Sequence, residues 1–123
     1  MSPDQPGEQW RIVTARAARK DFAKFGSATT ELRAKIAVLR TNPDVGDRLE
    51  GALEDALSLK FSLKGMGECR VAYIKLTDNR ICLLFMVGPR ENFYREALRR
   101  FEAVQRRDDF GLDDAVSTDG DER

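Results

Sequence analysis

The spacing of the hydrophobic residues changes part-way along this chain, and that change restricts the fold more than any other feature. Between residues 15 and 39 hydrophobic side chains recur every three or four positions, the spacing of one face of a helix. From 58 to 64 they alternate with polar residues, as in a half-exposed strand. Ile81 to Val87 is apolar throughout, as expected for a central strand covered on both faces. The sequence therefore predicts an α+β domain.

We expect the elements in the order strand, helix, helix, three antiparallel strands and helix. The two N-terminal helices would form a hairpin packed on a small antiparallel sheet, with a C-terminal helix, and the helices would lie on the sheet's core face. Gly26 would end the first helix, Thr29 or Thr30 would cap the second, and Asn42-Pro43 would stop it. The stretch from 44 to 57 is interpreted as a loop with at most one helical turn. The expected ranges are a strand at 10–13, a helix at 15–25, strands at 58–64, 69–76 and 81–87, and a helix from about 91 to 107.

The turn between the last two strands predicts their register and the state of both cysteines. Asp78-Asn79 is typical of a two-residue hairpin turn, which would place Cys82 opposite Lys75 and Cys69 opposite Gly88. The two thiols would then lie too far apart for a disulfide. We interpret them as reduced core thiols, which favours a cytoplasmic location.

Composition limits the chemistry that this chain can perform. Its 123 residues and 13.9 kDa fit one domain. The chain contains no histidine, which excludes Ser-His-Asp and Cys-His catalysis and histidine-ligated metal sites within it. We expect no metal and no cofactor, so catalysis would use Lys, Arg, Tyr, Asp, Glu, Ser or Cys. No apolar run is long enough to span a membrane and no signal peptide pattern is present, so we expect no membrane partner.

Charge is unevenly distributed although the formal net charge is zero. Residues 9–107 carry 20 basic and 12 acidic side chains, a net charge of +8, whereas residues 108–123 carry seven acidic side chains and one basic. We expect a disordered N-terminus at 1–8, a domain at 9–107 and an acidic, disordered tail at 108–123. One interpretation of this uneven charge is that the basic domain binds polyanions. The plainer interpretation is that the acidic tail only increases solubility.

Polar side chains on the predicted strands are the first candidates for a functional site. Lys60 and Lys64 fall on the polar face of the alternating strand, and Arg70 lies between apolar residues on the next. The plainer interpretation of the lysines is a solvated strand face. For Arg70 it is a structural ion pair with one of three glutamates: Glu68, Glu91 or Glu96.

The predicted last helix has an apolar stripe and an arginine-rich face. The stripe would comprise Tyr94, Ala97 or Leu98, Phe101 and Val104, which makes a core role for the tyrosine an alternative to a functional one. The arginines would form either a solvated face or a binding surface, and they are Arg95, Arg99, Arg100, Arg106 and Arg107.

Several short strings, in this order, resemble those of one protein family. They begin with Ile12-Val13 before the first helix, Asn42-Pro43 after the second, and Leu49-Glu50-Gly51 before the alternating strand. Residues 69–73, CRVAY, are similar to "YRVxY", and residues 87–94, VGPRENFY, are similar to "GxRxxxY". Together they resemble the RelE/ParE superfamily of toxins from type II toxin-antitoxin systems. The resemblance extends from about residue 10 to residue 104.

The resemblance implies a small toxin with a cognate antitoxin as its partner. One branch of the superfamily cleaves ribosome-bound mRNA without a metal, through attack of the RNA 2'-hydroxyl on the adjacent phosphodiester, and so inhibits translation. The other branch poisons DNA gyrase and cuts no RNA. We favour the endoribonuclease, with gyrase inhibition as the alternative. The third hypothesis is that the protein is an inactive homologue of these toxins.

The resemblance also implies roles for individual residues. Lys60 would neutralise the phosphate or act as the base, Arg70 would bind the scissile phosphate, and Arg90 would stabilise the transition state or leaving group. Tyr94 would stack on a base or assist proton transfer. Further RNA contacts would come from Lys64, Arg95 and Arg99. The chain departs from the family pattern at Ser62, where some relatives have a second basic residue, and at Cys69, which replaces an aromatic residue.

Overall fold

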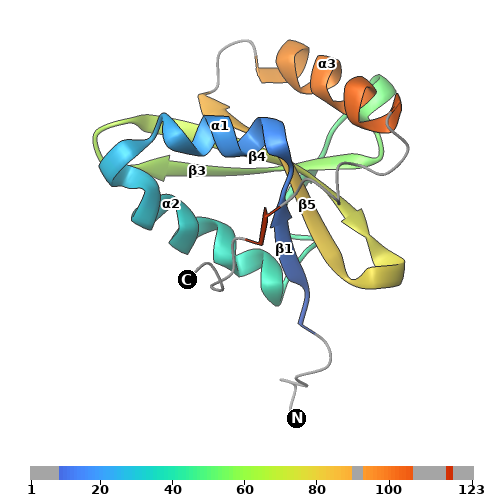
Figure 1. Ribbon diagram of the computed structural model, residues 1–123, viewed down its shortest axis with the longest axis horizontal. Helices are drawn as coiled ribbons and strands as arrows, with labels where there is room; N and C mark the ends of the chain where they lie inside the picture. The colour runs from blue at the N-terminus through green and yellow to red at the C-terminus, as the bar shows by residue number, and fades with distance from the viewer. Residues whose placement is uncertain (1–8, 90–92, 107–115, 118–123) are drawn as a thin grey trace.

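The computed structural model describes residues 9–89, 93–106 and 116–117 (Figure 1). The expectations for residues 1–8 and for most of the acidic tail lie outside the described residues. The main elements are β1 (Arg11–Thr14), α1 (Arg16–Ala23), α2 (Thr29–Ile36), β2 (Asp47–Arg48), β3 (Ala56–Leu63), β4 (Gly67–Leu76), β5 (Ile81–Pro89), α3 (Phe93–Arg106) and β6 (Val116–Ser117). Short 3-10 helices lie at Gly26–Ala28, Ala37–Arg40, Gly51–Leu53 and Thr77–Asn79. The predicted order of the larger elements is confirmed, whereas β2 and β6 were not predicted.

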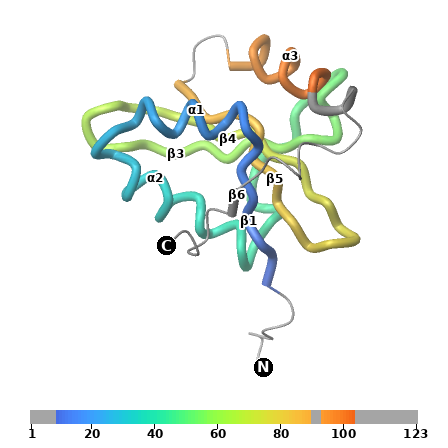
Figure 2. The backbone as a smooth tube through the Cα atoms, viewed as in Figure 1, coloured from blue at the N-terminus to red at the C-terminus, as the bar shows by residue number. Residues whose placement is uncertain are grey.

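The six strands form one sheet in the order β2-β3-β4-β5-β1-β6. Neighbouring strands are antiparallel except β1 and β5, which run parallel, with Arg11 opposite Ile81. The prediction of an antiparallel sheet is therefore wrong for β1, because two helices separate this strand from the β3-β4-β5 meander that it joins. Figure 2 shows β6 beside β1, where Val13 pairs with Ser117.

Helices cover both faces of the sheet instead of one. Phe22 of α1 and Leu32 of α2 pack with Tyr73 and Cys82 in one core cluster. Phe93, Ala97 and Phe101 of α3 pack on the opposite face in a second cluster. The prediction of a single helical layer is wrong, because β5 is buried from Ile81 to Gly88 and so needs cover on both faces. In the part of the chain that is described, no helix is long and apolar enough to cross a membrane.

The expected N-terminal helical hairpin is not confirmed. The helices α1 and α2 diverge from the bend at Gly26–Ala28 (Figure 1), although both contribute to the same core cluster. Thr29 does not cap α2, since its hydroxyl donates to the carbonyl oxygen of Gly26 at 2.7 Å and the N-cap position is Ala28. The geometry of the bend, and not a side-chain cap, therefore determines where α2 begins.

The segment between Pro43 and Gly46 is attached to the sheet by one buried phenol. The Tyr73 hydroxyl donates to the carbonyl oxygen of Pro43 at 2.7 Å and accepts a hydrogen bond from the Gly46 amide at 3.0 Å. A Cβ atom at Gly46 would lie 2.7 Å from this hydroxyl, so the position requires glycine. Burial raises the pKa of Tyr73 to about 12, which keeps the hydroxyl proton available for the bond to Pro43.

A β-bulge changes the register between β4 and β5. Lys75 faces Cys82 as predicted, but Cys69 faces Pro89 and not Gly88. The register shifts between Ala72 and Tyr73, and Phe85 is left without a partner in the ladder. Both cysteines are free and buried, as predicted. Burial raises the pKa of Cys82 to about 12, so this thiol stays protonated.

The bulge also places two successive residues of β5 on the same face. Phe85 and Met86 both belong to the cluster under α3, whereas Leu84 and Val87 belong to the opposite cluster. The Phe85 ring packs against Phe101, with ring centroids 5.8 Å apart. The residue added by the bulge, Phe85, thus packs against α3.

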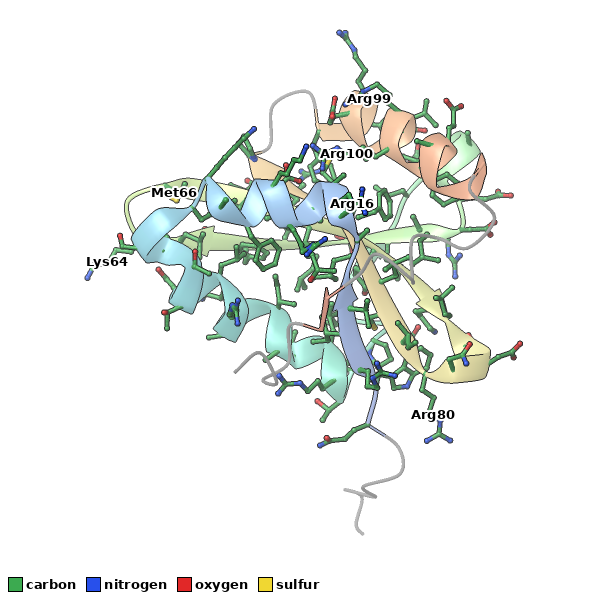
Figure 3. All side chains as sticks on the ribbon, in the orientation of Figure 1. Arg16, Lys64, Met66, Arg80, Arg99 and Arg100 are labelled. Atoms are coloured by element: carbon green, nitrogen blue, oxygen red, sulfur yellow. The ribbon has the colours of Figure 1, made fainter. Side chains whose placement is uncertain are left out.

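Beyond Leu84, β5 continues past the end of β1, and side chains satisfy its backbone there. The Asp21 carboxylate accepts a hydrogen bond from the Val87 amide at 3.0 Å, and the Arg100 guanidinium donates one to the Phe85 carbonyl oxygen at 3.3 Å. Arg100 also forms a two-bond ion pair with Asp21, whose Oδ1 lies 3.0 Å from Nη2. Figure 3 shows Arg100 between α1 and α3. Burial alone would lower the pKa of Arg100, but its bonds to Asp21 and Glu96 outweigh burial and raise it.

We expect Asp21→Ala to lower the free energy of unfolding by about 3–5 kcal/mol, because it leaves the Val87 amide without its acceptor and the largely buried Arg100 with only Glu96 and the Phe85 carbonyl oxygen. Urea unfolding followed by circular dichroism measures this loss. Glu54→Ala is the control, because Glu54 is exposed, so the change in the free energy of unfolding should stay within about 0.5 kcal/mol. A loss below 1 kcal/mol in Asp21→Ala would show that this ion pair is not an anchor.

Candidate functional site

Two predicted cationic residues lie directly opposite each other on neighbouring strands. The antiparallel register of β3 and β4 pairs Lys60 with Arg70 and Ser62 with Glu68. Side chains opposite each other share a face of the sheet, with Cβ atoms about 4.5–5.5 Å apart. Lys60 and Ser62 are exposed, and the Arg70 side chain is 28% exposed. The sheet therefore presents two cations side by side to solvent.

The cation pair lies on the face that α3 covers, at the point where this helix begins. Ala72, two residues from Arg70 on β4, already belongs to the cluster under α3. The Arg70 guanidinium lies over the ring of Phe93, the first residue of α3, at 5.9 Å from its centroid. Because Phe93 is buried, its ring gives the guanidinium a fixed support. The geometry suits recognition of an anion that approaches the open part of the sheet.

Glu68 lies in the same group of side chains. Its Oε2 atom accepts hydrogen bonds from Nε and Nη2 of Arg70, at 3.4 and 3.3 Å. Of the three partners expected for Arg70, the described residues thus provide Glu68. Burial, and then the Glu68 charge, raises the pKa of the neighbouring Cys69 thiol, so this cysteine is not an activated nucleophile.

Tyr94 is exposed and attaches α3 to the loop before β3. Its side chain is on the helix surface, 43% exposed, and its hydroxyl donates to the Glu50 carbonyl oxygen at 2.6 Å. Gly51 has a φ of 62°, and a Cβ atom there would lie 3.0 Å from the hydroxyl. The prediction that Tyr94 belongs to the apolar stripe is wrong, because the buried stripe is Phe93, Ala97 and Phe101.

The other predicted site residues lie elsewhere. Lys64 follows the end of β3, its backbone amide donates to Glu31 of α2 at 3.2 Å, and its side chain points away from the molecule (Figure 3). Arg99 is exposed on α3 and forms an ion pair with Glu96, lowering the pKa of that carboxyl group through its hydrogen bonds. Arg95 is exposed on α3. Arg90 lies outside the described residues. The structure thus brings together Lys60 and Arg70 but not Lys64 or Arg99.

Two members of this group were not among the predicted site residues. Glu68 was considered only as an ion-pair partner, although the two-residue period of Glu68, Arg70 and Ala72 places it on the same strand face as Arg70. Phe93 carried no signal beyond its helical spacing from Ala97 and Phe101. Its contact with Arg70 depends on where α3 crosses the sheet, which periodicity does not show.

The comparisons with known proteins agree on the fold. A family model described as "ParE-like toxin of type II bacterial toxin-antitoxin system" matches residues 12–98. The structure is similar to that of an E. coli RelE mutant in the free state, with a TM-score of 0.60, 20% identity, and coverage of 75% of this chain and 97% of that chain. It is also similar to the RelBE2 toxin-antitoxin complex from Mycobacterium tuberculosis, with a TM-score of 0.56, 20% identity, and coverage of 67% and 99%.

A third similar structure is the intact E. coli RelBE toxin-antitoxin complex, with a TM-score of 0.54, 20% identity, and coverage of 67% of this chain and 98% of that chain. The comparison with curated proteins gave no match. At these identities the likeness establishes the α+β fold.

We expect Tyr94→Phe to lower the free energy of unfolding by about 1 kcal/mol, because it removes the hydrogen bond to Glu50 and keeps the ring. Chemical denaturation of both proteins measures the difference. Arg95→Gln is the control on the neighbouring exposed position and should leave the stability within about 0.5 kcal/mol. Equal stability of Tyr94→Phe and the unmodified protein would mean that the hydroxyl does not hold the loop.

Proposed function

This chain belongs to the family of ParE-like toxins of type II bacterial toxin-antitoxin systems, and we propose that within it the chain acts as an endoribonuclease on ribosome-bound mRNA. The observation that supports this activity is the cross-strand pair of Lys60 and Arg70 beside the start of α3. A toxin that acts on the ribosome would act in the cytoplasm.

The paired cations suit a phosphodiester as ligand. A guanidinium offers several N–H donors in one plane, and an ammonium adds a second, movable charge. Because β3 and β4 hold both side chains on one face, a phosphate between them would meet positive charge from two directions. This arrangement supports the proposal, because positive charge at the phosphorus favours RNA transesterification.

In the proposed reaction the RNA 2'-hydroxyl attacks the adjacent phosphorus and the 5'-oxygen leaves. Negative charge builds up on the phosphate oxygens in the transition state, and Arg70 and Lys60 would stabilise it there. Arg90 would assist this stabilisation, as the family resemblance implies. Tyr94 would stack on a base, because its ring is exposed whereas its hydroxyl proton is used in the bond to Glu50.

Gyrase inhibition is the second candidate function, and two observations favour it. The matching family model is described as ParE-like, and Ser62 stands where some members of the RelE branch have a second basic residue. Under this alternative the cation pair would bind a protein surface and no RNA would be cut.

A cognate antitoxin is the proposed partner in both cases. Two of the similar structures are toxin-antitoxin complexes, at identities that establish only the fold. The basic domain at 9–107, with its net charge of +8, would favour an acidic antitoxin segment.

We expect Arg70→Ala to reduce mRNA cleavage on purified, mRNA-programmed ribosomes on the order of a hundredfold, because a lost transition-state donor typically costs about 2.7–4 kcal/mol. Arg70→Lys should also be impaired, since it keeps the charge but loses the planar fork. Primer extension measures the cleavage, and gyrase supercoiling is assayed in parallel.

Lys35→Ala is the control, because Lys35 is an exposed cation on α2, the helix that covers the opposite face of the sheet. It removes the same charge and should cleave at the unmodified rate. Intact mRNA together with inhibited gyrase in the unmodified protein would replace the nuclease by the second candidate. Unchanged cleavage by a folded Arg70→Ala would remove Arg70 from the site.

A further inference from the structure

A carboxylate lies beside the cation pair, Lys60 and Arg70, to which the proposed function assigns phosphate binding. Glu68 forms an ion pair with Arg70 on its own strand and lies opposite Ser62, which is two residues from Lys60 and on the same face of the sheet. A negative charge at this position repels a phosphate and competes with it for the guanidinium. Its presence therefore needs an explanation.

Stability does not provide that explanation. The side chains of Arg70 and Glu68 are 28% and 36% exposed, and ion pairs at such positions contribute about 0–1 kcal/mol. Phe93 already supports the guanidinium from below. The fold would lose little if Glu68 were a neutral residue.

Proton transfer does provide an explanation. The 2'-hydroxyl must lose a proton as it attacks, and the chain contains no histidine to accept it. An ammonium or guanidinium holds its own proton at neutral pH, and the Tyr94 hydroxyl donates to Glu50. Among the described side chains gathered at Arg70, Glu68 alone is a carboxylate, which can accept a proton without first losing one.

The hydrogen bonds of Glu68 leave room for this role. Both bonds from Arg70 end on Oε2, and no described residue donates a hydrogen bond to Oε1. The Nη1 group of Arg70 is not used by Glu68 and remains for the phosphate. One guanidinium would thus bind the phosphate and orient the carboxylate beside it.

We propose that Glu68 is the proton acceptor of the cleavage step, an inference that rests on the proposed endoribonuclease function. Its carboxylate takes the proton of the 2'-hydroxyl while the 2'-oxygen forms a bond to phosphorus and the bond from phosphorus to the 5'-oxygen breaks. The leaving 5'-oxygen takes a proton from water, and the hydroxide so formed is neutralised when Glu68 releases its proton. The products are a 2',3'-cyclic phosphate and a 5'-hydroxyl.

The test compares Glu68→Gln, Glu68→Asp and Glu102→Gln with the unmodified protein. Glu102 is an exposed glutamate of α3, so Glu102→Gln removes the same charge away from the cation pair. Single-turnover cleavage is measured on programmed ribosomes at saturating toxin. Affinity is measured separately on ribosomes whose mRNA carries 2'-O-methyl groups and cannot be cleaved, and thermal unfolding checks the fold.

We expect Glu68→Gln to cleave about a hundredfold more slowly at saturation, the usual contribution of a general base, while binding uncleavable mRNA more tightly than the unmodified protein does. Glu68→Asp, which keeps the carboxylate, should recover part of the rate. Glu102→Gln should cleave and bind as the unmodified protein does. Slower chemistry combined with tighter binding is the result that a merely structural role would not give.

Three outcomes would overturn the assignment. A full saturating rate in Glu68→Gln would make Glu68 a competitor of the phosphate and not a base. Equal losses in Glu68→Gln and Glu68→Asp with a lowered unfolding temperature would make it structural. No cleavage by the unmodified protein would refute the endoribonuclease function itself, and this role of Glu68 with it.

Discussion

The ion pair of Asp21 with Arg100 holds together parts of the fold that no strand pairing joins. Strand β5 extends beyond the end of β1, so its last residues have no neighbouring strand on that side. There Asp21 accepts a hydrogen bond from the Val87 amide, and Arg100 donates one to the Phe85 carbonyl oxygen. Because Asp21 comes from α1 and Arg100 from α3, helices on opposite faces of the sheet are tied around one edge. The helix attached in this way begins at Phe93, whose ring lies against the Arg70 guanidinium.

The β-bulge in β5 also determines which side chains lie under α3 and which residue lies beside the cation pair. It turns both Phe85 and Met86 toward α3, where an uninterrupted strand would have turned only one of them. It also moves every later residue of β5 by one position relative to β4, so that Gly88 and not Val87 is opposite Arg70. The cation pair therefore has a residue without a side chain as its neighbour on β5.

The sequence was most informative where one period extends over a whole element. Alternation located β3 and β4, but the pairing of Lys60 opposite Arg70 was not predicted. Contacts between distant residues were beyond its reach, since Asp21 and Arg100 are 79 positions apart and no local pattern links them. A shift of one position misassigned the buried stripe of α3, because Phe93 and Tyr94 fit a helical period almost equally well. The bulge and the parallel pairing of β1 have no signature in residue spacing.

The two-residue strand β6 has a consequence for the behaviour of the chain in solution. Without it, β1 would be the last strand of the sheet, with the backbone groups of Val13 and Thr14 facing outward. A bare, apolar strand edge is a template for pairing between molecules, and charged flanking residues oppose such pairing. Val116 and Ser117 cover this edge, and Asp113, Asp114 and Asp119 flank them in the sequence. Val116 and Ser117 thus occupy backbone groups of β1 with which a second molecule could otherwise pair.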